Sequence, residues 1–281
     1  MILIAESGST RTEWAIIDRD YIVGHEFTEG INPYFQSRRE ISHSVRLGLP
    51  ESFFKKRYEK VYFYGAGCTT ADRKGLINAS LVAQFKSPIE VESDLLAAAR
   101  GLFKDESGIA CILGTGSNSC LYDGKNIIQN VKSLGYVLGD EGSGAVMGRI
   151  FLADCLKELA PKDIIELFYE KFRITADDAL ESVYSRPFPN RFLSTISFFL
   201  NEHIENEYIY NLVYSNFRNF FIRNIFQYDY KNYPIRFVGS VAHIYNDVLT
   251  EVAKEFNIEI SKTVESPMSG LVDFHTNTCK I

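Results

Sequence analysis

The sequence predicts an α/β protein built from two similar domains, and two observations support this prediction. Strand-like apolar runs alternate with helix-like segments over the first half of the chain. A short pattern also occurs twice, as ILIAESGSTRTEWAIID near the N-terminus and as IACILGTGSNSCLYDG 108 positions later. A repeat at this spacing in a chain of 281 residues indicates a duplicated domain.

Each copy of the repeat predicts a hairpin with a tight glycine turn. Glycine lets the backbone approach an anion closely, and neighbouring serine and threonine hydroxyls add donors. One such turn is typical of an ordinary hairpin, but two copies favour a pair of nests that bind the phosphates of one polyphosphate. The repeat aligns Gly8, Ser9 and Thr10 with Gly116, Ser117 and Asn118.

The elements of the first half follow from apolar alternation and from turn residues. We expect strands at residues 2–7, 14–18, 21–27, 60–64 and 89–92, and helices from the loop at 30–33 to about residue 49, at 72–85 and at 94–103. The polar tetrad DESG at 105–108 separates this unit from the second hairpin. It predicts one domain at residues 1–105 and another at 106–281.

The second half is expected to open with strands at residues 109–113, 120–123 and 126–131, followed by a helical insertion from 143 to about 230. It should end with a strand at 235–238, a helix at 240–256, a strand at 258–264 and a short helix after Pro267. Within the insertion, EYIYNLVYSNFRNFFIRNIF is apolar around much of its circumference and predicts a core helix. An aromatic ligand platform and a homodimer face are the alternatives.

Composition excludes several classes of partner. A net charge of -6 and an isoelectric point near 5.5 argue against nucleic acid or anionic membrane, which attract clustered Lys and Arg. Glu6 interrupts the first apolar run too early for a signal peptide or membrane helix, so we expect a cytoplasmic protein. The five histidines show no clustered spacing, so none of them is assigned to a metal.

Cysteine spacing excludes two further kinds of site. The five cysteines form no C-x-x-C pair, so neither a disulfide framework nor a zinc site is supported, and buried thiols are expected at Cys68, Cys111, Cys120, Cys155 and Cys279. The motifs of serine hydrolases, P-loop enzymes and Rossmann dehydrogenases are also absent from the sequence.

Asp94 follows an apolar strand and begins a helix, where α/β sheets present side chains to ligands. A carboxylate there can accept the proton of a hydroxyl that attacks a phosphoryl group. Ser93 or Asp94 could instead serve only as the N-cap of the helix.

The run LGYVLGDEGSG places Asp140 and Glu141 in a glycine-rich loop before a helix. Acids at a helix N-terminus are favoured by the macrodipole, but two carboxylates in such a loop exceed what capping requires. They can accept hydrogen bonds from adjacent sugar hydroxyls, so the loop suits a polyol.

Two further positions predict contacts with a nucleotide. Glu6, at the end of the first strand, would repel phosphate unless a hydrated Mg²⁺ lay between them, although it could also be a solvated strand-end acid. In FVGSVAH, a strand ends at Gly239 and Ser240 begins a helix, a junction that can pack against a base or ribose.

Seven segments taken in order resemble the N-acetylglucosamine kinase group of the BadF/BadG/BcrA/BcrD ATPase-like family. They are AESGSTRTEW, the loop at 30–33, FYGAGC, VESDLLAAARG, ILGTGSNS, GYVLGDEGSG and FVGSVAH. The resemblance spans nearly the whole chain and implies the fold shared by actin, hexokinase and Hsp70. In that fold, two duplicated ribonuclease-H-like domains close on ATP in an interdomain cleft.

The resemblance also implies roles for single residues. Asp94 matches the catalytic base, and Glu6 stands where many members of the superfamily have Asp, although amino-sugar kinases also use Glu. The remaining matches are Gly8, Ser9, Thr10 and Arg11 for the first phosphate loop, Gly114, Thr115, Gly116 and Ser117 for the second, Gly239 and Ser240 for adenosine, and Asn32, Asn118 and Asp140 for the sugar.

The implied reaction is transfer of the ATP γ-phosphoryl group to the 6-hydroxyl of an N-acetylhexosamine, with Mg²⁺ and with a homodimer as the expected assembly. N-acetylmuramic acid and glucosamine are alternative substrates, and Arg11, Arg73 and Lys132 are candidate partners for a carboxylate. A reductase-activating ATPase and a non-catalytic sugar sensor are the alternatives from other classes. The cysteine-rich zinc motif of ROK sugar kinases is absent from the sequence.

Overall fold

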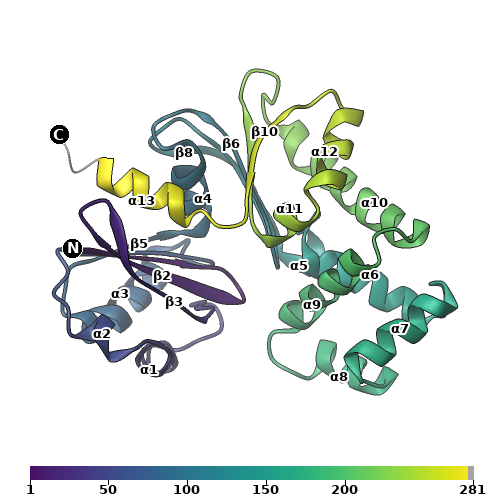
Figure 1. Ribbon diagram of the computed structural model, residues 1–281, viewed down its shortest axis with the longest axis horizontal. Helices are drawn as coiled ribbons and strands as arrows, with labels where there is room; N and C mark the ends of the chain where they lie inside the picture. The colour runs from purple at the N-terminus through teal and green to yellow at the C-terminus, as the bar shows by residue number, and fades with distance from the viewer. Residues whose placement is uncertain (278–281) are drawn as a thin grey trace. The chain divides into compact units, whose positions relative to one another are not determined.

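The computed structural model describes residues 1–277, and these residues form an α/β fold with two five-stranded sheets (Figure 1). The predicted fold class is therefore confirmed. The chain divides into two compact units, which are described separately below.

The elements of the first 103 residues follow the predicted order closely. They are β1 (Ile2–Ser7), β2 (Arg11–Asp18), β3 (Tyr21–Glu29), α1 (Arg38–Gly48), α2 (Glu51–Phe54), β4 (Lys60–Gly65), α3 (Ala71–Phe85), β5 (Ile89–Ser93) and α4 (Asp94–Phe103). The sequence did not predict the single turn α2, and it placed the start of β2 three residues late.

The later elements agree less well at their boundaries. They are β6 (Gly108–Leu113), β7 (Ser117–Tyr122), β8 (Ile127–Val131), α5 (Gly135–Leu138), α6 (Gly144–Leu156), α7 (Lys162–Phe172), α8 (Ala176–Tyr184), α9 (Pro189–Glu202), α10 (Glu207–Arg223), the 3₁₀ turn η1 (Ile225–Gln227), β9 (Ile235–Val238), α11 (Ser240–Ile244), α12 (Asn246–Glu255), β10 (Ile260–Val264) and α13 (Met268–Asn277). The helix expected at 240–256 is two helices, because the chain breaks at Tyr245.

Parallel pairing in the first sheet brings three strand ends to one edge. The strand order is β3-β2-β1-β4-β5, with β1 parallel to β4 and β4 parallel to β5. Ser7 is opposite Gly65, and Gly65 is opposite Ser93. Because parallel strands end at the same edge, the loops after β1, β4 and β5 and the start of α4 meet there.

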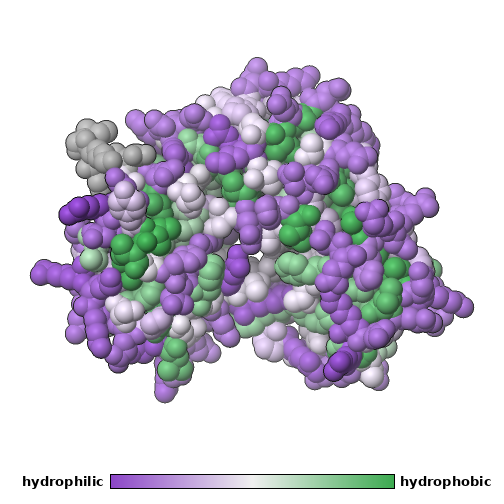
Figure 2. Space-filling view, in the orientation of Figure 1, coloured by the Kyte–Doolittle hydropathy of each residue, from purple (hydrophilic) through white to green (hydrophobic). Residues whose placement is uncertain are grey.

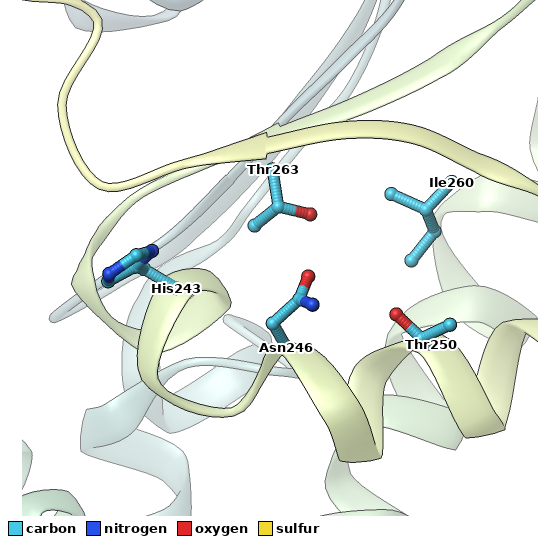
Figure 3. Close-up of a pocket in the computed structure, with 5 residues that line it drawn as sticks. All are labelled: His243, Asn246, Thr250, Ile260 and Thr263. Carbon is cyan, nitrogen blue, oxygen red and sulfur yellow. The ribbon is translucent and has the colours of Figure 1, made fainter.

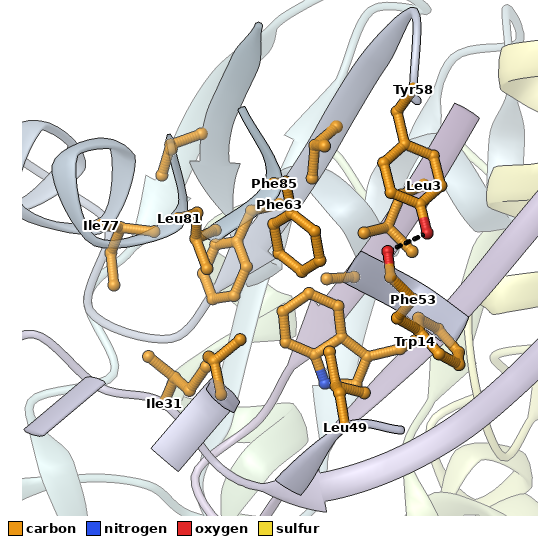
Figure 4. Close-up of a cluster of buried hydrophobic side chains, with 14 of the residues drawn as sticks. Leu3, Trp14, Ile31, Leu49, Phe53, Tyr58, Phe63, Ile77, Leu81 and Phe85 are labelled. Carbon is orange, nitrogen blue, oxygen red and sulfur yellow. Dashed lines mark hydrogen bonds between the residues drawn. The ribbon is translucent and has the colours of Figure 1, made fainter. Parts of the chain in front are cut away.

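Alternation along β1 builds a separate core on each face of this sheet. Leu3 and Ala5 belong to one cluster, whereas Ile4 belongs to the other, as the period of two in a strand requires. The first cluster packs against α1, α2 and α3 and surrounds the indole of Trp14 (Figure 4). Within this cluster, the hydroxyl of Tyr58 donates to the carbonyl of Phe53 at 2.7 Å (Figure 4).

The second cluster explains why the compact units differ from the predicted domains at 1–105 and 106–281. Residues 266–277 belong to the first unit together with Met1–Ala110 and Tyr122–Ile128, and the second unit holds Cys111–Leu121 and Gln129–Glu265. Helix α13 buries Leu271 and Val272 against Ile4, Ile17 and Ala97. The apolar face of α13 thus completes the core between the sheet and α4.

The second unit has an aromatic core around its helical insertion. The second sheet has the order β10-β9-β6-β7-β8, with β9 parallel to β10. In α10, Phe217, Phe220 and Phe221 are fully buried, and Phe220 and Phe221 both contact the ring of Phe237 from β9. The prediction that this segment is a core helix is confirmed.

The buried thiols expected from the sequence are confirmed at the four cysteines that the structure describes. Cys68, Cys111, Cys120 and Cys155 are buried free thiols, and Cys279 lies outside the described residues. Figure 2 shows hydrophilic side chains over much of the visible face, with hydrophobic side chains in smaller groups among them. Among the helices within residues 1–277, none is both long and apolar enough to cross a membrane.

A buried polar contact fastens α13 to the first sheet, and it generates a prediction. The hydroxyl of Tyr64 lies 2.8 Å from Arg100 Nη1 and 2.8 Å from His275 Nε2, and burial lowers the pKa of His275 to about 4. Tyr64→Phe leaves the half-buried guanidinium of Arg100 and the buried imidazole of His275 without this partner. We therefore expect a loss of about 1–3 kcal/mol in the free energy of unfolding, measured in urea. The matched control is the exposed Tyr21, where Tyr21→Phe should change stability by less than about 0.5 kcal/mol. Equal effects at the two tyrosines would contradict the prediction.

Candidate functional site

The first glycine turn joins β1 to β2 through Gly8, Ser9 and Thr10. The N–H of Gly8 donates to the carbonyl of Arg11 at 3.0 Å, which closes the turn. At its base, the buried hydroxyls of Ser7 and Thr12 lie 2.8 Å apart, and the Ser7 hydroxyl also accepts from the N–H of Ile31 at 2.9 Å. These internal bonds fix the shape of the turn without using an external ligand.

Gly30 supports the same turn from outside. Its N–H donates to the carbonyl of Thr10 at 3.0 Å, and a Cβ at this position would lie 2.6 Å from the carbonyl oxygen of Gly8 and 2.7 Å from that of Ser9. Only a residue without a side chain permits this approach. Sequence reasoning noted Gly30 as a loop residue and missed Ser7, whose burial in a strand end carries no local signal.

The second glycine turn joins β6 to β7 through residues 114–116. The N–H of Gly114 donates to the carbonyl of Gly116 at 2.9 Å. Each turn connects its strands through three residues, so Gly8 corresponds to Gly114, 106 positions later. The alignment of Gly8 with Gly116 at a spacing of 108 was wrong by two residues, because it matched the letters Gly-Ser rather than the strand ends.

The glycine-rich run after β8 packs directly on this second turn. The N–H groups of Gly144 and Ala145, in the first turn of α6, donate to the carbonyls of Gly114 and Thr115 at 2.9 and 3.1 Å. The buried carboxylate of Asp140 lies against Gly116, since a Cβ there would be 3.0 Å from Asp140 Oδ2. The structure therefore brings Asp140 to the turn predicted to bind phosphate.

Glu141 and Asn118, the other two residues of the second unit that are predicted to contact the sugar, already have protein partners. Glu141 forms an ion pair with Arg223 at 3.4 Å. Asn118 Oδ1 accepts from the N–H of Ser119 and from Asn130 Nδ2, both at 2.9 Å. Asn118 therefore retains its amide nitrogen as a donor for a ligand, whereas the carboxylate of Glu141 is shared with Arg223.

Gly239 also contacts the second turn. It has φ +124°, and a Cβ would lie 2.2 Å from the carbonyl oxygen of Leu113, the residue that precedes Gly114. Its N–H donates to the carbonyl of Val264 in β10 at 3.0 Å. The start of α11 at Ser240 is thus placed next to the predicted phosphate loop.

In the first unit, Asp94 lies at the sheet edge that also carries the first turn. Ser93 is the N-cap of α4, because its hydroxyl accepts from the N–H of Leu96 at 3.2 Å. Asp94 Oδ1 accepts from the N–H of Leu95 at 2.8 Å, so Asp94 contributes to capping as well. Burial nevertheless raises the pKa of Asp94 from 3.8 to about 6, and the backbone N–H groups of Leu95 and of Asp94 itself offset only part of that rise.

Glu6 is a second carboxyl with a perturbed pKa at this edge. Burial, followed by the negative charges of Asp94 and Glu13, raises the pKa of Glu6 from 4.5 to about 8, and Arg11 opposes the rise. A divalent cation beside Glu6 would favour the ionised form of this carboxyl, and Mg²⁺ prefers carboxylate and water oxygens. Within residues 1–277, no group of three or more His, Cys, Asp or Glu side chains is placed to hold a metal ion by itself.

Asn32 lies over the loop that follows β4. Its Oδ1 accepts from the N–H of Tyr34 at 2.9 Å, and a Cβ on Gly67 would lie 2.5 Å from the same oxygen. Since β4 pairs with β5, the Gly67 loop and Asp94 share one sheet edge. The first unit therefore brings together Glu6, the first turn, Asn32 and Asp94. Sequence reasoning assigned no role to Gly67 within FYGAGC, where a φ of +79° and the close approach of Asn32 Oδ1 together favour glycine.

A pocket of about 440 Å³ lies beside α11 and β10 in the second unit (Figure 3). Side chains of His243, Asn246, Thr250, Ile260 and Thr263 line it, and those of Thr263, Asn246 and Thr250 point into the same space. It contains none of the residues that the sequence predicts for phosphate or sugar.

Comparison with solved structures finds a relative with high sequence identity. A candidate N-acetylglucosamine kinase from Porphyromonas gingivalis is 44% identical, with a TM-score of 0.95 over 99% of this chain and 100% of that chain. A second candidate N-acetylglucosamine kinase, from Chromobacterium violaceum, is 15% identical with a TM-score of 0.72 over 97% of this chain and 98% of that chain, and so shares the fold. No protein-family model and no curated protein sequence matches the chain.

The contact of Gly239 with Leu113 generates a prediction. Gly239→Ala adds a Cβ against a carbonyl oxygen at a backbone conformation that L-residues rarely adopt, so we expect a loss of more than about 2 kcal/mol in the free energy of unfolding. Gly75 in α3 is the matched control, since a Cβ there meets nothing within 4 Å and Gly75→Ala should stabilise by about 0.5–1 kcal/mol. Urea unfolding of both variants measures the difference, and a neutral Gly239→Ala would refute the steric argument.

Proposed function

The chain belongs to the N-acetylglucosamine kinase-like family of the actin and hexokinase superfamily, and we propose on this basis that it transfers the γ-phosphoryl group of ATP to the 6-hydroxyl of an N-acetylhexosamine such as N-acetylglucosamine. The observation that carries the proposal is Asp94, a carboxyl with a pKa of about 6 at the sheet edge that also holds the first glycine turn. Such a group is ionised at neutral pH and still basic enough to accept a proton.

Asp94 acts as the base for the sugar hydroxyl. As the 6-oxygen forms its bond to the γ-phosphorus, its proton passes to the Asp94 carboxylate, and the bond from the γ-phosphorus to the β,γ-bridging oxygen breaks to release ADP. The N–H of Leu95 fixes one carboxylate oxygen, which orients the other. Positioning and charge stabilisation supply most of the rate enhancement in phosphoryl transfer.

The two glycine turns supply donors for the phosphates. Gly8, Ser9, Thr10 and Arg11 form the first set, and Gly114, Thr115, Gly116 and Ser117 form the second. Mg²⁺ would be held through water by Glu6 and would neutralise charge on the phosphates. Gly239 and Ser240 would contact adenosine.

Amide and carboxylate groups would bind the sugar. Asn32 and Asn118 have their side-chain oxygens occupied by backbone donors, which leaves each Nδ2 to donate to a sugar oxygen. The carboxylate of Asp140 would accept from sugar hydroxyls, with Glu141 beside it. A homodimer and a cytoplasmic location are part of the same proposal.

The proposal predicts which sugars are phosphorylated and by which residue. With ATP and Mg²⁺, the protein should form a sugar phosphate from N-acetylglucosamine or N-acetylmuramic acid, but much less from glucosamine or glucose, as measured by mass spectrometry. Asp94→Asn should lower kcat about 10²- to 10⁴-fold, whereas Asp163→Asn, in the exposed first turn of α7, should not. ATP hydrolysis without any sugar phosphate would contradict the kinase and favour a reductase-activating ATPase.

The raised pKa of Asp94 predicts a pH dependence. The base must be ionised, and its ionised fraction falls as pH drops through about 6, so kcat/KM for the sugar at saturating ATP should fall about tenfold per pH unit below that value. An acidic limb near pH 4, typical of an unperturbed aspartate, would argue against Asp94 as a shielded base. The limb should be unchanged in Asp163→Asn.

A further inference from the structure

Arg73 occupies a position that the phosphoryl-transfer site does not explain. It lies in the first turn of α3, and its guanidinium carbon is 3.3 Å from the centroid of the Tyr34 ring. Its side chain forms no ion pair or hydrogen bond with residues 1–277, whereas the adjacent Lys74 is paired with Glu92 at 2.6 Å. A planar cation stacked on an aromatic face keeps its donors at its edge free for an acceptor.

This stacked pair is built onto the loop that carries Asn32. The N–H of Tyr34 donates to Asn32 Oδ1, and a Cβ on Gly67 would lie 2.5 Å from that oxygen and 2.7 Å from the Tyr34 ring. Tyr34 is 53% exposed and Arg73 is half-buried, so the stacked pair lies at the surface rather than in the core. Arg73 therefore lies beside the predicted sugar contact, at the sheet edge that carries Asp94.

The other two cations considered for a carboxylate have different surroundings. Arg11 lies 4.8 Å from the centroid of the Phe27 ring, and its charge lowers the pKa of Glu6. Its charge therefore acts at the predicted phosphate and cation site. Lys132 is exposed after β8 in the second unit. Arg73 is thus the one whose contacts include the Asn32 loop.

We propose that Arg73 binds a carboxylate carried by the sugar, so that the preferred substrate is an N-acetylhexosamine with an acidic substituent such as the 3-O-lactyl group of N-acetylmuramic acid. This inference rests on the proposed function. A guanidinium binds a carboxylate through two parallel N–H···O bonds, which neither a neutral sugar nor an ester can reproduce.

The test compares kcat/KM for N-acetylmuramic acid, its lactyl methyl ester and N-acetylglucosamine. The unaltered protein should prefer the free acid to both neutral sugars, chiefly through a lower KM. Arg73→Gln should reduce this preference about 10- to 100-fold, the range for a hydrogen-bonded charged pair. Arg39→Gln, which removes an exposed charge from α1, should leave the preference unchanged.

Binding separates failure of this inference from failure of the kinase proposal. Calorimetric titration of the same three sugars, with a non-hydrolysable ATP analogue present, should give tighter binding of the free acid that Arg73→Gln abolishes. Equal binding or turnover of acid and ester, or equal losses for all three sugars in Arg73→Gln, would overturn the role of Arg73. Absence of any sugar phosphate, with the binding preference intact, would overturn the kinase and leave the carboxylate site standing.

Discussion

The parallel pairing of β4 with both β1 and β5 is the constraint on which the first half of the site depends. Hydrogen bonding along these strands sets Ser7, Gly65 and Ser93 side by side. The chain must then turn out of the sheet at three adjacent points, and a glycine turn, the Gly67 loop and the start of α4 occupy them. A slip of one residue in the register of β1 would move Glu6 to the opposite face of the sheet.

In the second unit, close packing of backbone segments positions the residues of the site. Gly239 lies against Leu113, Gly116 lies against the carboxylate of Asp140, and the first N–H groups of α6 are bonded to the second turn. A Cβ at Gly239 would overlap the Leu113 carbonyl oxygen at 2.2 Å, and one at Gly116 would lie tightly against Asp140 at 3.0 Å, so neighbouring groups favour glycine at both positions as well as any ligand does. Part of the sequence signature of a phosphate loop is therefore a signature of packing.

Much of the fold could be predicted because it follows from local patterns. Alternation identified β1 and β5, and a polar residue before an apolar helical run marked the start of α4 at Asp94. The α/β class followed from these patterns and from the repeat, whereas the family followed from the resemblance of seven segments to a known group. Local patterns also identified α10 as a core helix, since its apolar residues cover more than one side.

What the sequence did not reveal depends on contacts between distant residues. The ion pair of Glu141 with Arg223 and the stacking of Arg73 on Tyr34 join separate elements, and no spacing along the chain indicates them. The spacing of the two glycine turns was predicted two residues too long, because the matching Gly-Ser letters do not stand at equivalent positions after their strands. The packing of α13 into the first unit was missed because an amphipathic helix shows that it has an apolar face but not which sheet that face will cover.

The return of α13 to the first unit also sets an order on folding during synthesis. Ribosomes extend the chain from the N-terminus, so the strands β1, β2 and β4 and the helix α4 emerge long before the segment that covers them. Ile4, Ala15, Ala97 and Tyr64 keep an uncovered face until residues 266–277 leave the ribosome. The second sheet also waits, because β6 pairs with β9 and β9 with β10, but these strands precede Ser266. The core between the first sheet and α4 is therefore completed after the second sheet has its strands.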